Sequence, residues 1–341
     1  MKRSVVRCGL LLTILALAGC ATQEARRNDG RIEEASFVTI NGIQQWVSIR
    51  GDNRRNPVLL FIHGGPADPQ SALVETYAPF ERDFVFVQWD QRGAGKTFAA
   101  NRQFVKGLTL EEMAQDGVEL AEYLSNRFQH RKIIVLGHSW GSTLATAMVL
   151  RKPTLFSAYV GTGQVSSWRA SATAQWEYLR LAATAAKDKE TLDRMATIGN
   201  PDFFDAGQYF SWRNIMNRKY LGAADSGWLR NLRSMAAEKF SDDERKDLGE
   251  GGAFSAAQLM KVMMTTDLGV TANQMPVPFY VIQGRDDLYT PTAPAIEYFD
   301  SVRASRKELI VIEGAGHFAV ATHTKEFLQA LTRVGLRRSG E

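Results

Sequence analysis

Cysteine is almost absent from this 341-residue chain, which contains only Cys8 and Cys20. A disulfide framework or a thiolate metal site needs several cysteines in the folded body, and two near the start of the chain do not supply them. Five histidines are present, without a cluster of metal ligands around them. The sequence therefore predicts neither a metal nor another cofactor, and it excludes cysteine as a nucleophile of the folded body.

A strong excess of one charge is also missing. Of the formal net charge of +4, the residues Lys2, Arg3 and Arg7 account for +3, which leaves +1 for the rest of the chain. Binding to a phosphate backbone requires a basic surface, so nucleic acid is not a predicted partner. The hydrophobic fraction of 45% and the charged fraction of 23% are typical of a globular protein. The length allows one large domain with an insertion.

Apolar runs long enough to span a bilayer are missing too. The run 10–17 is short, follows a basic start, and ends in the letters LAGC, which resemble a bacterial lipobox. We therefore expect a lipoprotein signal peptide over 1–19, a lipid on Cys20 that anchors the chain to a membrane, and a polar tether over 20–34. A plain secretory signal or an uncleaved anchor is the alternative. Ala21 favours the bacterial cell envelope at the periplasmic face of the outer membrane.

Short apolar runs alternate with helical patterns in two parts of the chain, 35–164 and 274–341. Asn41-Gly42 between two alternating runs predicts a β-hairpin at the start. Apolar strands that alternate with helices are typical of a parallel sheet covered on both faces, so an α/β core is predicted. The predicted strands lie at 58–62, 84–89, 133–136, 156–160, 279–282 and 309–312.

The segment 165–273 breaks this alternation. It is helical in pattern, rich in alanine, tryptophan and arginine, and contains no clear buried strand. Such a block within an α/β pattern predicts an inserted helical cap over the active site. Within it, the charged and glycine-containing stretch 241–252 is predicted to be an exposed loop or a frayed helix end.

The motif G-x-S-x-G occurs at 137–141, between a predicted strand and a predicted helix. This context makes a sharp turn that exposes the hydroxyl of Ser139 at the carboxyl edge of the sheet. The helix N-terminus adds partial positive charge and free backbone N–H groups beneath a developing anion. Ser139 is therefore the predicted nucleophile.

A serine hydroxyl needs a base, and the base needs a carboxylate to hold it. His317 follows the last predicted strand, and loops at the carboxyl ends of parallel strands build sites. Asp287 follows the strand before it, with Asp286 as the local alternative. The chain order Ser139, Asp287, His317 is that of α/β-hydrolases. We predict that His317 is the general base and that Asp287 orients it.

A second glycine turn follows the predicted strand 58–62, with the letters HGGP. The N–H of Gly65 in this turn and the N–H of Trp140 after the nucleophile are the predicted oxyanion hole. One such donor can lower the barrier by about 3 kcal/mol.

Together these segments resemble the proline iminopeptidase (prolyl aminopeptidase) family of α/β-hydrolases. The matching segments are HGGP at 63–66, DQRGAGKT at 90–97, GHSWGS at 137–142, GRDD at 284–287 and GAGHF at 314–318. The resemblance implies an α/β-hydrolase fold and an aminopeptidase that releases N-terminal residues, often proline, from peptides through an acyl-enzyme. Ala67 departs from the family's usual HGGPG, and the cap lacks the family's glutamate-bearing segments. Glu177 is a possible ligand of the substrate's amino group, with an exposed helix carboxylate as the alternative.

Two other functions remain open at this point. The same catalytic residues with an apolar cap fit a carboxylesterase, lipase-like enzyme or thioesterase acting on small acyl esters. A non-catalytic lipoprotein that uses the fold as a binding module is the alternative of another class. The predicted partners are thus a small peptide or ester substrate and a membrane reached through the lipid anchor, with no particular oligomeric state predicted.

Overall fold

The computed structural model describes residues 30–102, 107–129, 131–200 and 206–336. The predicted signal peptide 1–19 and the lipid site Cys20 lie outside the described residues. Among the helices that are described, none has both the length and the apolar character needed to cross a bilayer.

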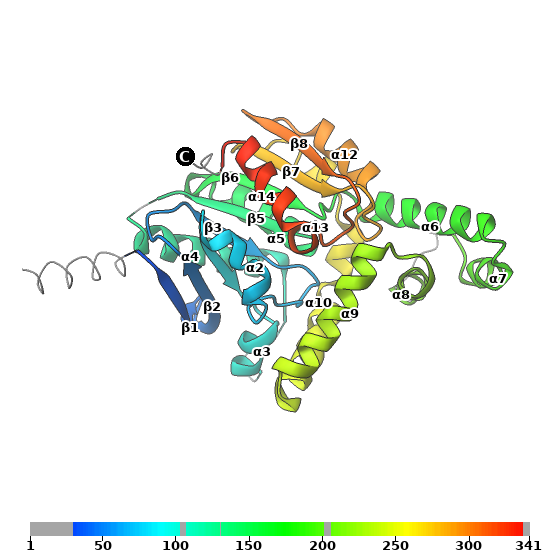
Figure 1. Ribbon diagram of the computed structural model, residues 1–341, viewed down its shortest axis with the longest axis horizontal. Coiled ribbons are helices and arrows are strands. Elements are labelled where there is room, and N and C mark those ends of the chain that lie inside the picture. The colour runs from blue at the N-terminus through cyan, green and yellow to red at the C-terminus, as the bar shows by residue number, and fades with distance from the viewer. Residues whose placement is uncertain (1–29, 103–106, 130, 201–205, 337–341) are drawn as a thin grey trace, which may run out of the picture.

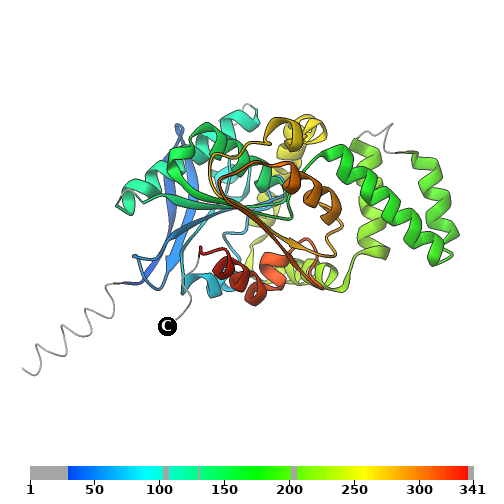
Figure 2. The ribbon, with the colours of Figure 1, turned by 90° about the horizontal axis from the view of Figure 1, so that it is seen from above.

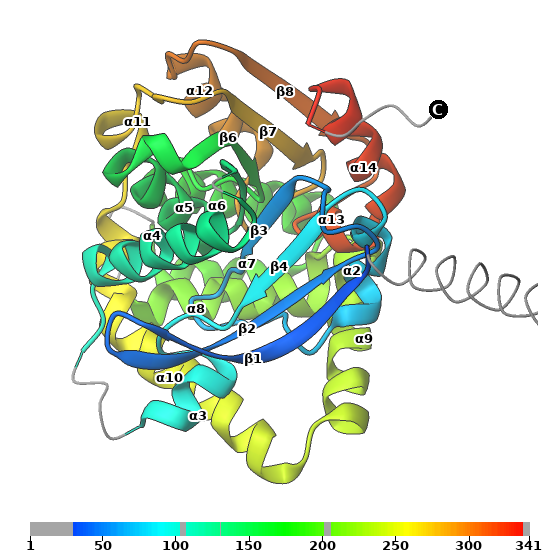
Figure 3. The same ribbon diagram turned by 90° about the vertical axis from the view of Figure 1, so that its left-hand side faces the viewer.

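One eight-stranded sheet forms the centre of the molecule, in the order β1-β2-β4-β3-β5-β6-β7-β8 (Figure 3). β1 (Ile32–Ile40) and β2 (Ile43–Gly51) form the predicted antiparallel hairpin. Asn41 and Gly42 connect them with positive φ angles of 47° and 77°, which suit a tight hairpin turn. β2 pairs antiparallel with β4, and the remaining pairs are parallel. The predicted mostly parallel sheet is confirmed.

The parallel strands have largely apolar sequences, and all of them except the edge strand β8 are buried along almost their whole length. They are β3 (Val58–Ile62), β4 (Val85–Trp89), β5 (Ile133–His138), β6 (Phe156–Thr162), β7 (Phe279–Gly284) and β8 (Lys307–Ile312). In β3, Val58, Leu60 and Ile62 join the hydrophobic core on one face, whereas Leu59 and Phe61 join the core on the other. The alternation of side chains along a strand therefore builds two cores from one apolar run.

Helices cover both faces of the sheet (Figure 2). The first core contains side chains of α4 (Leu110–Arg127), α5 (Trp140–Arg151) and α12 (Thr292–Ser301). The second contains side chains of α2 (Val74–Glu81), α13 (Ala319–Thr322) and α14 (Thr324–Arg333). The short helices α3 (Gly95–Asn101) and η1 (Pro153–Leu155) complete this part of the chain. This layered arrangement is the predicted α/β core.

Helices fill the connection between β6 and β7 and extend to one side of the sheet (Figure 1). They are α6 (Trp168–Ala185), α7 (Lys189–Ile198), α8 (Ala206–Ile215), the π-helical η3 (Met216–Tyr220), α9 (Ala223–Lys239), α10 (Asp242–Thr265) and α11 (Leu268–Thr271). We refer to these helices as the cap. α10 returns to the core, where the hydroxyl of Ser255 donates to the carbonyl of Gly93 at 2.9 Å.

The prediction of a loop or frayed end over 241–252 is wrong, because these residues begin α10. A capping box starts the helix: the side chain of Ser241 accepts from the N–H of Glu244, and the Glu244 carboxylate accepts from the N–H of Ser241. Gly251 then lies against Phe98 of α3, where an added Cβ would be 3.1 Å from the ring. Capping and packing therefore stabilise a helix that charge and glycine content disfavour.

Candidate active site

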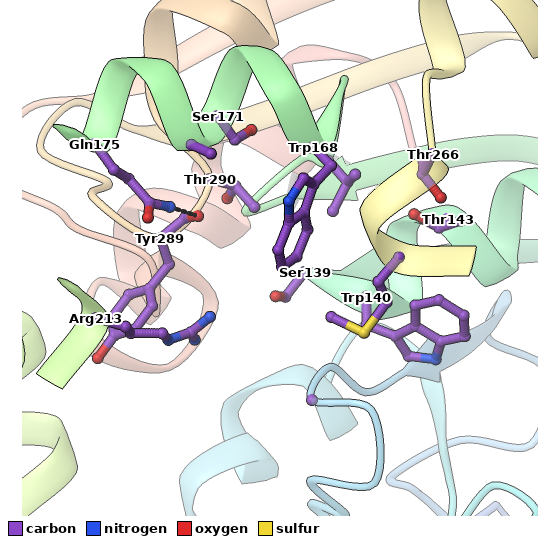
Figure 4. Close-up of a pocket in the computed structure, with 14 residues that line it drawn as sticks. Ser139, Trp140, Thr143, Trp168, Ser171, Gln175, Arg213, Thr266, Tyr289 and Thr290 are labelled. Atoms are coloured by element: carbon purple, nitrogen blue, oxygen red, sulfur yellow. Dashed lines mark hydrogen bonds between the residues drawn. The ribbon is translucent and has the colours of Figure 1, made fainter. Parts of the chain in front are cut away.

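Ser139 occupies a strained turn between β5 and α5. Its φ of 55° and ψ of −126° lie in a region that non-glycine residues rarely adopt. The flanking glycines make this turn possible: a Cβ on Gly137 would lie 2.6 Å from the carbonyl of Gly141, and one on Gly141 would lie 2.0 Å from the carbonyl of Ile62. The turn directs the hydroxyl of Ser139 into a cavity beneath the cap (Figure 4).

His317 and Asp287 form a buried pair at the carboxyl ends of β8 and β7. Nδ1 of His317 lies 3.0 Å and 2.9 Å from the two carboxylate oxygens of Asp287. The side chain of His317 is 3% exposed and that of Asp287 is fully buried. A carboxylate bound to Nδ1–H fixes the tautomer in which Nε2 can accept a proton. The structure thus gives this imidazole the form that a general base requires.

Asp287 is itself held by four further hydrogen bonds. Its oxygens accept from the N–H groups of Tyr289 and Thr290 at 2.8 Å each, from the Thr290 hydroxyl at 2.9 Å and from Nε2 of Gln283 at 3.0 Å. Burial alone would raise the pKa of Asp287, but the charge and hydrogen bond of His317 and the bonds from Thr290 hold that pKa below its usual value. The carboxylate is therefore ionised and fixed in position.

The imidazole of His317 lies beside the turn that carries Ser139. Its ring centroid is 4.8 Å from that of His138, the residue before Ser139. A Cβ on Gly163 at the end of β6 would approach the His317 ring to 2.8 Å. Within the described chain, Ser139 and His317 do not hydrogen-bond. In free enzymes such a bond is often long, and it tightens only when substrate binds. Catalysis therefore does not require this hydrogen bond in the free protein.

Gly65 and Trp140 line the same cavity as Ser139. Trp140 begins α5, and the first N–H groups of a helix have no partner within it. Gly65 has a φ of 115°, and a Cβ there would lie 2.7 Å from the N–H nitrogen of Asp68, so only glycine fits. A Cβ on the neighbouring Gly64 would lie 2.9 Å from that of Ser139. The two predicted donors therefore border Ser139, the predicted nucleophile.

The ring of His63 holds the loop of Gly65 in place through two hydrogen bonds to the backbone. Its Nδ1 donates to the carbonyl of Gly64 at 2.9 Å, and its Nε2 accepts from the N–H of Gln91 at 3.3 Å. Burial lowers the pKa of His63 to about 4, so the ring is neutral near pH 7. Both ring nitrogens are engaged with the backbone, which makes this histidine structural.

The cap covers a cavity above Ser139, whose empty volume is about 560 Å³ including the part that opens to solvent. Core and cap side chains share its lining: Gly65, Ser139, Trp140, Thr143, Val165, Trp168, Ser171, Ala172, Gln175, Arg213, Met263, Thr266, Tyr289 and Thr290. Nε2 of Gln175 donates to the carbonyl of Tyr289 at 2.7 Å, and the Arg213 guanidinium lies 4.2 Å from the centroid of the Tyr289 ring (Figure 4). Of these lining residues, Arg213 alone carries a charged side chain, and its charge is positive.

Two of the acidic residues considered from the sequence lie elsewhere. Glu177 does not line the cavity: its carboxylate pairs with Arg180 on the exposed side of α6, which lowers its pKa. Asp286, the alternative to Asp287, is exposed, while Asp287 contacts His317. The proposed contact of Glu177 with a substrate amine thus has no structural support.

Asp225 in α9 is a site residue that the sequence analysis missed. Its Oδ2 accepts from the N–H of His317 at 2.8 Å, and its Oδ1 accepts from the N–H of Phe318 at 3.3 Å. The sequence around it carries no recognisable motif. Gln283 and Thr290 were missed as well, although both lie close to Asp287 along the chain.

The chain is similar to known proteins along most of its length. The family described as serine aminopeptidase, S33, matches residues 54–321. The probable aminopeptidase YbaC of Bacillus subtilis is 26% identical over 305 residues, covering 87% of this chain and 94% of that protein. A proline iminopeptidase of Lactobacillus crispatus is 22% identical, covering 86% and 94%.

Solved structures show the same fold. The crystal structure of a proline iminopeptidase-related protein from Thermus thermophilus has a TM-score of 0.61 at 20% identity and covers 88% of this chain and 98% of its own. A 2-hydroxy-6-oxo-6-phenylhexa-2,4-dienoate hydrolase from Rhodococcus has a TM-score of 0.57 at 18% identity, covering 89% and 98%. At these identities the likeness concerns the fold alone.

Proposed function

Since this chain belongs to the serine aminopeptidase S33 family of α/β-hydrolases, we propose that it is an aminopeptidase of the proline iminopeptidase type, which releases N-terminal residues from peptides through an acyl-enzyme. The observation that carries its hydrolase chemistry is the buried His317–Asp287 pair beside the strained turn of Ser139. Relatives named as aminopeptidases match along most of their own length, which supports peptide substrates.

The proposed mechanism has two stages. Oγ of Ser139 attacks the carbonyl carbon of the scissile bond while Nε2 of His317 takes the hydroxyl proton, and the N–H groups of Gly65 and Trp140 stabilise the oxyanion. The imidazolium then protonates the leaving amine, and the C–N bond breaks to give the acyl-enzyme. Water attacks the ester with His317 as base and releases the acid. Asp287 stabilises each imidazolium form.

A second candidate, hydrolysis of small acyl esters, is favoured by the lining of the cavity. A free α-ammonium group is ordinarily bound by a carboxylate, and the described lining residues include none. An ester or thioester substrate needs no such partner. Arg213 and the aromatic side chains of Trp168 and Tyr289 suit a neutral or anionic acyl group.

The two candidates are separated by comparing proline p-nitroanilide with p-nitrophenyl acetate, using the full chain purified in detergent. The aminopeptidase proposal expects turnover of the anilide that disappears in Ser139→Ala. Hydrolysis of the ester alone would instead favour the esterase. No turnover of either substrate and no labelling of Ser139 by a fluorophosphonate would support a non-catalytic binding protein.

We also propose that Cys20 carries a lipid that anchors the enzyme in the bacterial cell envelope, at the periplasmic face of the outer membrane. The support is the sequence pattern, with a short apolar run followed by LAGC. Metabolic labelling with a fatty-acid analogue tests it: the wild-type chain should incorporate the label, and Cys20→Ser should not. Labelling that persists in Cys20→Ser would contradict the proposal.

A further inference from the structure

A carboxylate from the cap contacts the loop that carries His317. Asp225 lies in the first turn of α9 and is 1% exposed. Both of its oxygens accept backbone hydrogen bonds from this loop, at 2.8 Å from His317 and 3.3 Å from Phe318. Charge-assisted hydrogen bonds of this kind are stronger than neutral ones. The cap therefore holds the backbone of the histidine directly.

Gly316 allows this close approach. A Cβ on Gly316 would lie 2.2 Å, 2.4 Å and 2.5 Å from the three atoms of the Asp225 carboxylate. One turn further along α9, the ring of Trp228 packs against that of Phe318 with centroids 6.3 Å apart. Both rings are buried in the same hydrophobic core. An apolar contact thus adjoins the polar one and excludes water from it.

Asp225 also changes the charge around His317. Asp287 faces Nδ1 of the ring, and Asp225 approaches from the backbone side. The ring of His138 lies 4.8 Å away, and the carboxylate of Asp68 after the oxyanion loop is within electrostatic range. Burial raises the pKa of Asp225, and the backbone N–H bond and charge of His317 oppose that rise. The imidazole therefore has three carboxylates near it, Asp287 and Asp68 from the core and Asp225 from the cap.

We propose that Asp225 is a positioning residue, which ties α9 of the cap to the loop of His317 and adds a further negative charge near the imidazolium formed during acylation. The inference rests on the proposed role of His317 as base. An imidazole held within a fraction of an ångström of its productive position reacts faster than a mobile one. A nearby negative charge stabilises the cationic ring in the transition state.

Asp225→Asn is the first test, because it preserves the size of the side chain while removing its charge and one acceptor. We expect kcat for p-nitrophenyl acetate to fall roughly tenfold, because a less well positioned imidazole reacts more slowly. The loss of a negative charge disfavours the imidazolium, so the acidic limb of the kcat/KM profile should move to lower pH by about half a unit or more. Thermal unfolding of the same samples verifies that the variant is folded.

Asp188→Asn is the matched control. Asp188 also lies at the start of a cap helix and accepts from a backbone N–H, that of Thr191 at 3.0 Å, but it pairs with Lys219 and Tyr220 away from the cavity. The Asp188→Asn substitution should change neither kcat nor the pH profile of kcat/KM. A merely structural cap carboxylate would behave as this control does.

A pair of substitutions tests the same contact without relying on the charge. Gly316→Ala should lower kcat in the wild-type chain, because its Cβ displaces the Asp225 carboxylate. In the Asp225→Ala background the obstacle is gone, so the same change should have a much smaller effect. Equal effects in both backgrounds would overturn the proposal.

The remaining outcomes separate this proposal from the function on which it rests. If His317→Ala abolishes activity but Asp225→Asn leaves both kcat and the acidic limb unchanged, the positioning role is wrong and the hydrolase mechanism stands. If His317→Ala stays active, the mechanism itself fails. A rise in KM for proline p-nitroanilide alone, with an unchanged pH profile, would make Asp225 a substrate ligand and overturn its positioning role.

Discussion

Asp287, at the carboxyl edge of the core sheet, and the exposed carboxylates of the cap helices α6 and α7 are held in opposite ways. Asp287 of the core is buried and accepts hydrogen bonds from several groups, including His317. Glu177 and Asp193 of the cap form exposed ion pairs with Arg180 and Lys189 one turn away. Exposed ion pairs of this kind contribute little to the stability of the fold, and their side chains rearrange easily. A buried carboxylate whose oxygens all accept hydrogen bonds is fixed in position. With the proposed roles of Ser139, His317 and Asp287, this contrast predicts that the core residues determine the rate of the chemical step and that the cap determines substrate selectivity.

Asp225 differs from these exposed carboxylates of the cap. It belongs to a cap helix, yet it is buried and bonded as Asp287 is. With Asp225 as a positioning residue, one cap helix takes part in the catalytic geometry while α6 and α8 supply the walls of the cavity. Variants of Ser139, His317 and Asp287 should therefore change kcat, and variants of the α6 and α8 side chains that line the cavity should change KM.

Ser139→Ala should have the largest effect. Without the hydroxyl no acyl-enzyme can form, so we expect kcat to fall by roughly four or more orders of magnitude with an unchanged fold. Steady-state assays on ester and anilide, with fluorophosphonate labelling as a second readout, measure it. Residual activity above about one per cent of wild type would remove Ser139 from the mechanism.

Asp287→Asn should come next. The amide cannot stabilise the imidazolium and favours the wrong tautomer of His317, so kcat should fall roughly 10³- to 10⁴-fold. Asp286→Asn, the matched change at the adjacent exposed position, should remain within about twofold of wild type. If the two variants exchanged these effects, Asp286 would be the orienting residue instead.

The sequence predicted the core well because its signals are local. Each motif is contiguous and follows an apolar strand, so Ser139, Asp287 and His317 could be placed at one edge of the sheet before their contacts were known. The contact of Asp225 with His317 joins residues 92 positions apart, and no pattern near either one encodes it. The start of α10 was missed for a similar reason: Gly251 disfavours a helix locally, and the packing partner Phe98 lies far away in the chain.

Trp168→Ala should have a smaller effect than Ser139→Ala or Asp287→Asn, and it should change KM instead of kcat. The indole lines the same cavity as Ser139 (Figure 4). Losing its apolar contact with an acyl group should raise KM about tenfold and leave kcat within a few-fold. Trp176→Ala on the same helix is the control, since that ring packs on Trp212 with centroids 4.8 Å apart and does not line the cavity. An equal fall in kcat for both variants would indicate cap unfolding rather than selectivity.

Glu177→Gln should have the smallest effect. This variant tests whether an exposed carboxylate of the cap takes part in catalysis or in substrate binding. The carboxylate is exposed and pairs with Arg180, so its removal should leave kcat/KM for both the anilide and the ester within about twofold of wild type. A loss confined to the anilide would show that an exposed cap carboxylate binds the substrate's amino group. In that case the cap would have to rearrange around the substrate, because in this structure the Glu177 side chain lies outside the cavity.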